Sequence, residues 1–194
     1  MVRILAISDE EVPHAAARAE QADVDLLISA GDLPWSYAEE IAAAAGVPAA
    51  SVPGNHDQPG DAPPGYVGLD RRVAEVAGLR IAGLGGCVRY NGESPHQYTQ
   101  ERFHADARAL IETADGPVDL LVTHAPPLGL GDEPDPAHVG IEALHDLIET
   151  LRPAWHLHGH IHPYGRHKPD RTIGSTTIRN VVPWTIMEIE RSSS

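Results

Sequence analysis

The chain has 194 residues, a length that a single domain with one hydrophobic core commonly reaches. It carries 28 acidic and 14 basic residues, and the resulting formal net charge of −14 disfavours nonspecific binding to nucleic acid or to anionic membranes. Its single cysteine, Cys87, excludes an intrachain disulfide, and we recognise neither a signal peptide nor a run of about 20 apolar residues, so we expect a cytoplasmic protein.

Short runs rich in apolar and β-branched residues predict strands, and helical patterns lie between several of them. In chain order, the predicted strands are 2–8, 24–29, 47–52, 79–85, 118–123, 154–159, 176–181 and 185–190, and the predicted helices are 13–21, 35–45, 99–114 and 139–151. The alternation over 1–52 and 99–160 indicates βαβ units, whereas closely spaced strands near 65–85 and 171–190 indicate hairpins added to a sheet. We therefore predict a single α/β domain over residues 1–191, a sandwich of mixed sheets, with a disordered tail at 192–194.

Polar residues able to bind a metal follow these strands directly. In chain order they are Asp9 and Glu11, Asp32, Asn55 with His56, His124, and the pair His160 and His162. Ligand sites of open α/β sheets lie beyond the carboxyl ends of the strands, so we expect these side chains to converge. Carboxylate, amide and imidazole groups together suit Mn, Fe, Zn or a similar divalent ion, and there are enough of them for two ions that share one carboxylate. Each residue alone is more often a turn or buried polar residue than a ligand, but five such coincidences favour a metal site.

Three long polar loops, 53–65, 85–98 and 124–138, are rich in Gly and Pro, and loops of this length in a compact domain are usually functional. The second loop contains Arg89, Tyr90, Asn91 and His96, whose side chains are of the kinds that bind phosphate or stack on a base. Arg89 is the best candidate for a substrate-binding cation; the alternative is an ordinary surface arginine.

Five short motifs resemble those of the calcineurin-like metallophosphoesterase superfamily, and they occur in that family's order over residues 7–162. They are ISD ending at Asp9, Gly31-Asp32, GNHD at 54–57, THAPP at 123–127 and GHIH at 159–162. The resemblance implies a four-layer αββα sandwich, in which two mixed β-sheets are flanked by helices, with a dinuclear metal centre at one end. Glycines at the motifs would let the chain bend sharply and aim the following side chains at one point.

The resemblance also implies ligands and a reaction. One ion would be held by Asp9, the position of Glu11, Asp32 and His162, and the second by Asp32 as the bridge, Asn55, His124 and His160. The reaction would be hydrolysis of a phosphate ester by a metal-bridging water or hydroxide. His56 would be the catalytic group that protonates the leaving oxygen or stabilises its developing charge, unless it only orients its loop, and Asp57 would bond the amides of that loop. We expect His158 to orient the ligands and His156 to be buried.

The first motif departs from the family's Asp-x-His, because Glu11 stands where the histidine is usual. Four interpretations are open: Glu11 ligates in its place, Glu11 points away and the ion has fewer ligands, the loop shifts so that Glu10 reaches in, or the site is degenerate. With Asp9, Glu11 and Asp32 ionised, two divalent ions and one hydroxide make a neutral centre. Such a centre favours Mn²⁺ or Mg²⁺, and a monoanionic diester over a dianionic monoester. Glu10, one residue out of step, is expected to be solvated.

We therefore expect a phosphodiesterase in preference to a monoesterase, acting on a small phosphorylated substrate, with nucleotides among the candidates. Its cofactors would be two divalent ions, with Mn favoured over Fe, Zn and Mg. The alternative is a noncatalytic scaffold or interaction module with an altered metal site, although intact GNHD and GHIH motifs favour the enzyme. The acidic composition weighs against long nucleic acid and membranes as partners, and the single lysine, Lys168, is typical of a GC-rich or salt-adapted prokaryote.

Overall fold

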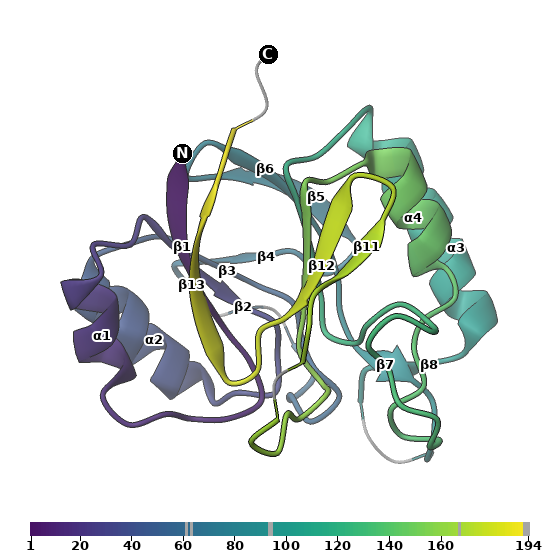
Figure 1. Cartoon of the computed structure of the whole chain (residues 1–194), viewed down its shortest axis with the longest axis horizontal. Coiled ribbons are helices and arrows are strands. Elements are labelled where there is room, and N and C mark those ends of the chain that lie inside the picture. Colours follow the sequence, from purple (N-terminus) through teal and green to yellow (C-terminus); the bar gives the residue numbers. More distant parts are fainter. Residues whose placement is uncertain (61, 63, 93–94, 167, 192–194) are drawn as a thin grey trace.

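Two β-sheets lie face to face in the middle of the molecule, and two pairs of helices cover their outer faces (Figure 1). The computed structural model describes residues 1–60, 62, 64–92, 95–166 and 168–191. The predicted tail at 192–194 lies outside the described residues. The arrangement is the four-layer αββα sandwich that the sequence predicts.

Both large sheets are mixed: the first has one antiparallel edge strand, β13, and is otherwise parallel, whereas the second has antiparallel strands at both edges and parallel strands between them. The first has the order β13-β1-β2-β3-β4 and consists of β13 (Trp184–Ile189), β1 (Val2–Ile7), β2 (Leu26–Ser29), β3 (Ala49–Ser51) and β4 (Tyr66–Gly68). The second has the order β11-β12-β10-β9-β6-β5 and consists of β11 (Arg171–Ile173), β12 (Thr176–Asn180), β10 (Trp155–His158), β9 (Leu120–Thr123), β6 (Leu79–Leu84) and β5 (Arg72–Val76). β7 (Cys87–Val88) and β8 (Gln97–Tyr98) pair in parallel and form a separate two-stranded sheet.

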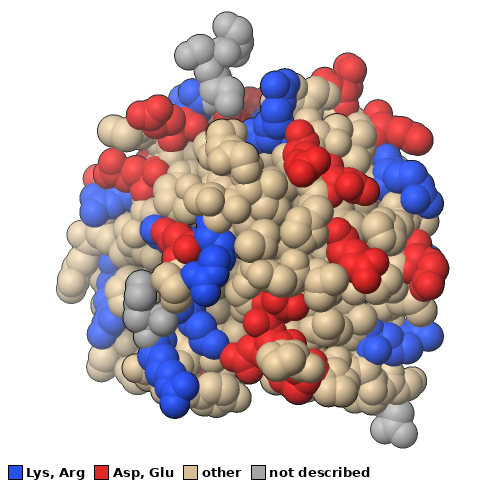
Figure 2. Space-filling view, turned by 45° about the vertical axis from the view of Figure 1, so that its right-hand side comes forward, with Lys and Arg blue, Asp and Glu red and all other residues tan. Residues whose placement is uncertain are grey.

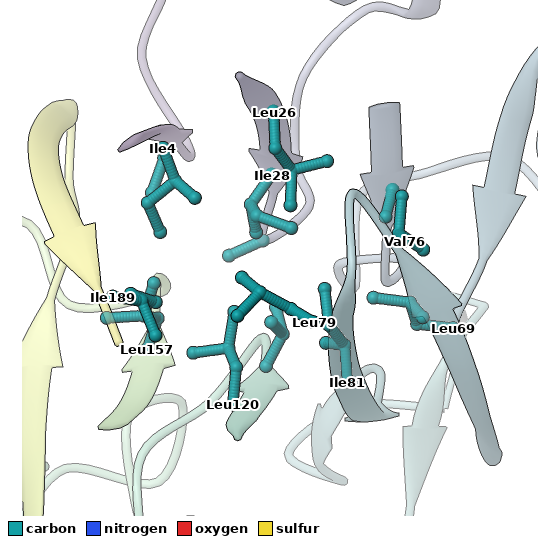
Figure 3. Close-up of a cluster of buried hydrophobic side chains, with 14 of the residues drawn as sticks. Ile4, Leu26, Ile28, Leu69, Val76, Leu79, Ile81, Leu120, Leu157 and Ile189 are labelled. Atoms are coloured by element: carbon teal, nitrogen blue, oxygen red, sulfur yellow. The ribbon is translucent and has the colours of Figure 1, made fainter. Parts of the chain in front are cut away.

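Helices α1 (Ala15–Gln21) and α2 (Trp35–Ala45) pack on the first sheet, and α3 (Gln100–Ala114) and α4 (Leu144–Leu151) pack on the second (Figure 1). Each sheet is therefore buried on both faces, which explains why strands such as VRILAI are almost continuously apolar. In β1, Ile4 faces the opposite sheet while Leu5 faces the helices. Figure 3 shows the layer between the sheets, where Ile4 and Ile28 of the first sheet pack with Leu157 of the second.

The predicted helix over 139–151 begins later than expected, at Leu144. The reason is a long-range backbone pairing: the Ile141 amide donates to the Pro126 carbonyl at 2.9 Å, and the Leu128 amide donates to the Ile141 carbonyl at 3.2 Å. This pairing holds the segment before α4 against the loop that follows β9. A helical pattern in the sequence does not reveal such a competing partner.

The two predicted hairpin regions contain hairpins, but in each region the chain also passes from one sheet to the other. β5 pairs antiparallel with β6, and β11 pairs antiparallel with β12, all in the second sheet. The neighbouring strands β4 and β13 belong instead to the first sheet, where β13 pairs antiparallel with β1. The prediction of hairpins added to a sheet near 65–85 and 171–190 is therefore confirmed for β5–β6 and β11–β12 but wrong for β4 and β13, because strand spacing does not specify the pairing partner.

The surface carries both signs of charge. Figure 2 shows acidic and basic side chains interspersed among uncharged ones over the face in view. Among the helices that the structure describes, none is both long enough and apolar enough to cross a bilayer.

Candidate metal centre

The candidate ligands meet because two sets of parallel strands end at the same place. β1, β2 and β3 run parallel in the first sheet, and β9 and β10 run parallel in the second, so the loops that follow them lie at matching ends. The rings of His124, after β9, and His160, after β10, have centroids 4.9 Å apart. The His124 Nδ1 donates to the Ala30 carbonyl, after β2, at 2.7 Å and so links the two sheets at this end.

His124 is the centre of the group and is fully buried. Since its Nδ1 donates to a carbonyl, its Nε2 is the atom left to face the other candidates. That nitrogen lies 3.1 Å from Asn55 Oδ1 and 3.3 Å from Asp32 Oδ2. His124, Asn55 and Asp32 therefore present one imidazole, one amide and one carboxylate to a common point.

Asp9 and His160 complete the buried part of the group. The Asp9 side chain is only 3% exposed, and its Oδ2 accepts from the His160 amide at 2.8 Å and from the Ser8 hydroxyl at 2.5 Å. The His160 Nε2 donates to the Ala137 carbonyl at 2.8 Å, which leaves its Nδ1 as a possible ligand atom. Ligand atoms of Asp9, His124 and His160 all lie within 4.8 Å of one another, a spacing that one ion can bridge.

His162 is fixed by Glu10 and not by Glu11. Its Nδ1 lies 2.7 Å from Glu10 Oε1, and its Nε2 lies 3.9 Å from Asp9 Oδ1. A carboxylate that accepts from one ring nitrogen of a histidine sets the tautomer in which the other nitrogen is free for a metal. The expectation that Glu10 is merely solvated is therefore incomplete: its side chain is 44% exposed, yet it is bonded to a candidate ligand.

Glu11, the residue in the histidine position of the first motif, is exposed. Within the described part of the chain, its carboxylate makes no hydrogen bond or ion pair with the other candidate ligands. It lies instead near Tyr37 of α2: burial raises the pKa of Tyr37, and the charges of Glu11 and Glu40 raise it further. The structure thus separates the two glutamates, with Glu10 on the side of the site and Glu11 on the side of α2.

The GNHD loop is held against Asp32 by its own backbone. The Asp57 carboxylate accepts from the Gly54 amide at 2.7 Å and from the Asp32 amide at 3.0 Å, which agrees with the expected structural role of Asp57. The His56 amide donates to Asp32 Oδ1 at 2.7 Å, while the residue itself is exposed. His56 is therefore anchored beside Asp32 with its ring accessible to a ligand.

Three candidate ligands adopt a backbone conformation that side chains other than glycine rarely take. The φ angles of Asp9, Asp32 and His160 are 64°, 56° and 66°, all in the left-handed region. Such conformations cost about 1–3 kcal/mol each and persist where the surrounding structure enforces them, often at functional sites. Each of the three lies just beyond the end of a strand, but eight other non-glycine residues of the described chain also have a positive φ, so this conformation is not confined to the site.

A proton on His124 offsets part of the negative charge of the group. Burial raises the pKa of Asp9. For Asp32, burial also acts to raise the pKa, but the charge and hydrogen bond of His124, together with His56, lower it to about 2. Burial acts to lower the pKa of His124, yet the charge and hydrogen bond of Asp32, together with Asp9 and the Ala30 carbonyl, raise it to about 9. Burial and the charge of His124 lower the pKa of His160 to about 3, which keeps its ring neutral.

This charge distribution fits a divalent cation. Within the described residues, neither lysine nor arginine pairs with Asp9 or Asp32. A bound cation can replace the His124 proton, because metal ligands bind in their deprotonated forms. Carboxylate, amide and imidazole donors together suit Mn, Fe or Zn. The donor set therefore matches the ions that the sequence leads us to expect, although it does not choose among them.

The remaining predicted residues lie outside this cluster. Arg89 is exposed, and its guanidinium donates to the Gln97 carbonyl of its own loop at 3.3 Å. His156 is fully buried with its Nε2 2.7 Å from the Thr123 hydroxyl, as expected. His158 is also buried, and its Nδ1 lies 2.9 Å from the Gly159 carbonyl.

Two contacts of the site were not singled out from the sequence. One is the bond from Glu10 to His162, across 152 positions of the chain, and the other is the bond from Asn55 Nδ2 to the Tyr90 hydroxyl at 3.3 Å. The sequence suggests Tyr90 as a phosphate-binding or stacking residue of a polar loop, but not as a partner of Asn55. Neither contact has a local sequence signal, because both depend on how distant loops meet.

Comparison with known proteins points to one family. A family model described as calcineurin-like phosphoesterase matches residues 3–164. The uncharacterized protein MJ1162 of Methanocaldococcus jannaschii is 26% identical over 121 residues, which cover 59% of this chain and 53% of that protein. The chain thus spans about half the length of this curated relative.

Solved structures show the same fold. The protein TT1561 of Thermus thermophilus superposes with a TM-score of 0.62 at 20% identity, covering 91% of this chain and 87% of that one. Another crystal structure superposes with a TM-score of 0.72 at 17% identity, covering 98% of this chain and 99% of its own.

Proposed function

The chain belongs to the calcineurin-like phosphoesterase family, and from that premise we propose that it hydrolyses the ester bond of a small phosphorylated substrate, a phosphodiester in preference to a monoester. The observation that carries this proposal is the buried group of Asp9, His124 and His160, whose ligand atoms lie within 4.8 Å of one another. Asp32 and Asn55 adjoin the same nitrogen of His124. A purely structural core would have little reason to bury two carboxylates here without a lysine or arginine.

The ligands divide into two groups that share Asp32. Asn55, His124 and His160 would hold one ion with Asp32, and Asp9 and His162 would hold the other with it. Glu11 is the ligand position that the geometry supports least, because the residue is exposed. Two divalent ions, when bound, would polarise the phosphoryl oxygens and supply a nucleophilic water at neutral pH. The donors mix carboxylate and amide oxygens with imidazole and so suit Mn²⁺ as well as Fe or Zn, and Mn²⁺ is the ion that we propose to test first.

The protein's own groups would handle the substrate. His56 is exposed and anchored through its amide to Asp32, so its ring can reach a phosphate held at the metal centre and donate a proton to the leaving oxygen. Asp57 keeps that loop in place through the amides of Gly54 and Asp32. The preference for a monoanionic diester over a dianionic monoester is strongest if Glu11 adds its charge to those of Asp9 and Asp32, because the centre with two divalent ions and one hydroxide is then neutral.

The test is turnover of two chromogenic esters. We expect the Mn²⁺-supplemented protein to hydrolyse bis-p-nitrophenyl phosphate faster than p-nitrophenyl phosphate. Asp32→Ala should abolish turnover, since it removes the shared carboxylate, and His56→Ala should lower kcat roughly 10²–10⁴-fold by removing a general acid. Wild-type turnover no higher than that of Asp32→Ala would overturn the proposal.

A second candidate function is a noncatalytic interaction module on the same fold. The observation that favours it is the exposed Glu11, which leaves one ion with fewer protein ligands than the family pattern provides. Elemental analysis of the purified protein separates the candidates, because a scaffold with a degenerate site would hold no divalent metal and would show no turnover. Metal at or near two ions per chain, together with turnover, would exclude the scaffold.

A further inference from the structure

A hollow of about 370 Å³ opens directly beside the proposed reacting centre. Two chain segments line it: residues 32–35, which lead from the end of β2 into α2, and residues 56–58 of the GNHD loop. Asp32 and His56 form the side towards the metal centre, and Leu33, Pro34 and Trp35 form an apolar side. The hollow is therefore continuous with the group that would protonate the leaving oxygen.

The position of this hollow identifies which part of a substrate would enter it. In an in-line displacement, the leaving oxygen departs on the side opposite the attacking water, and a general acid must lie next to that oxygen. His56 is the exposed group anchored beside Asp32, and it is also part of the wall of the hollow. A substituent carried by the leaving oxygen would therefore extend into this space.

The chemistry of the wall favours a planar, uncharged group. Trp35 is half-buried, and its indole packs edge-on against Tyr66, with ring centroids 5.7 Å apart and an interplanar angle of 69°. Trp35 also lines a second hollow of about 230 Å³. An aromatic ring held in this way offers a stacking surface at low entropic cost.

The same wall disfavours a charged leaving group. The residues that line the hollow include neither lysine nor arginine, and its two carboxylates, Asp32 and Asp57, already accept backbone hydrogen bonds. A leaving group that carries a further phosphate would meet negative charge without a compensating cation. The hollow therefore favours esters of aromatic alcohols or nucleosides over pyrophosphates.

We propose that this hollow binds an aromatic, uncharged leaving group, such as a nucleoside, by stacking on Trp35. The inference rests on the proposed function, because it takes His56 as the group nearest the leaving oxygen. It goes further in naming the substrate class and in assigning specificity to Trp35.

The experiment compares two phosphonates that share a head group and are not hydrolysed. Phenylphosphonate and methylphosphonate are titrated calorimetrically into the Mn²⁺-loaded protein. We expect phenylphosphonate to bind about tenfold more tightly, as stacking and burial of one ring allow. Trp35→Leu should reduce this preference to within about twofold while leaving the Kd for methylphosphonate unchanged, and Trp35→Phe should retain most of it.

A matched control is Trp184→Leu, because Trp184 is another half-buried tryptophan that lines a different hollow. It should leave the phenyl preference intact. Equal affinity of the wild type for both phosphonates, or an unchanged preference in Trp35→Leu, would overturn the inference. Unchanged methylphosphonate binding in Trp35→Leu shows that the variant is folded.

The two proposals fail in different ways. If the wild type turns over bis-p-nitrophenyl phosphate but shows no phenyl preference, the proposed function stands and the aromatic subsite is wrong. If it prefers phenylphosphonate in a Trp35-dependent manner but shows no turnover, the subsite exists and the proposed function is wrong.

Discussion

Glu10 and Glu11 are neighbours in the sequence, yet they act in different surroundings. The Glu10 carboxylate lies 2.7 Å from His162 Nδ1, whereas Glu11 is exposed on the side of Tyr37. The sequence alone does not show whether Glu10 or Glu11 reaches the metal site, because this depends on the conformation of the loop after β1. In the structure that loop begins with Asp9 in a left-handed conformation, with a φ of 64°.

The residue-scale prediction follows from this difference. Glu10→Gln replaces the charged acceptor of the His162 proton, so we expect the affinity for Mn²⁺ to fall roughly 10–100-fold, as happens when a carboxylate that supports a histidine ligand is lost. Glu11→Gln, the matched control, should change the affinity less than about threefold. Calorimetric titration of the metal-stripped variants measures both. A larger loss in Glu11→Gln would instead identify Glu11 as a ligand.

At the scale of the elements, the glycines of the motifs serve different purposes. Gly31 has a φ of +94°, so the sequence argument about sharp bending applies to it. Gly159 is required for another reason: a Cβ there would lie 2.5 Å from Asp9 Oδ2 and 2.8 Å from Ser8 Cβ. The end of β10 in one sheet thus approaches the end of β1 in the other more closely than a side chain permits. This requirement was invisible in the sequence, since it arises only when the sheets pack.

Gly159→Ala tests this close approach. The added methyl group would push Asp9 and its loop away from His160, so we expect Mn²⁺ affinity to fall at least about tenfold and stability to fall by about 1–3 kcal/mol, as in other overpacked sites. Gly92→Ala is the control, because a Cβ at Gly92 meets open space. Thermal unfolding and Mn²⁺ titration of both variants provide the comparison. Identical behaviour of the two variants would show that the close approach does not position Asp9.

At the scale of the whole molecule, the sequence predicted the layers and the motif residues better than the connections. Strands buried on both faces, such as VRILAI, are readily recognised, and five motifs in order indicated which residues meet at one end. The assignment of β4 and β13 to the first sheet could not be predicted, because strand patterns do not name their partners. The same limit hid the contact of Glu10 with His162 and the hollow between the β2–α2 turn and the GNHD loop.

The central claim is that both sheets deliver their ligands to one metal-dependent hydrolytic centre. The most direct measurement is turnover of bis-p-nitrophenyl phosphate by metal-stripped protein during stepwise addition of Mn²⁺. We predict that activity begins at the level of Asp32→Ala, rises with added Mn²⁺ and saturates at two ions per chain. Activity that stays at the level of Asp32→Ala throughout the titration would contradict the account.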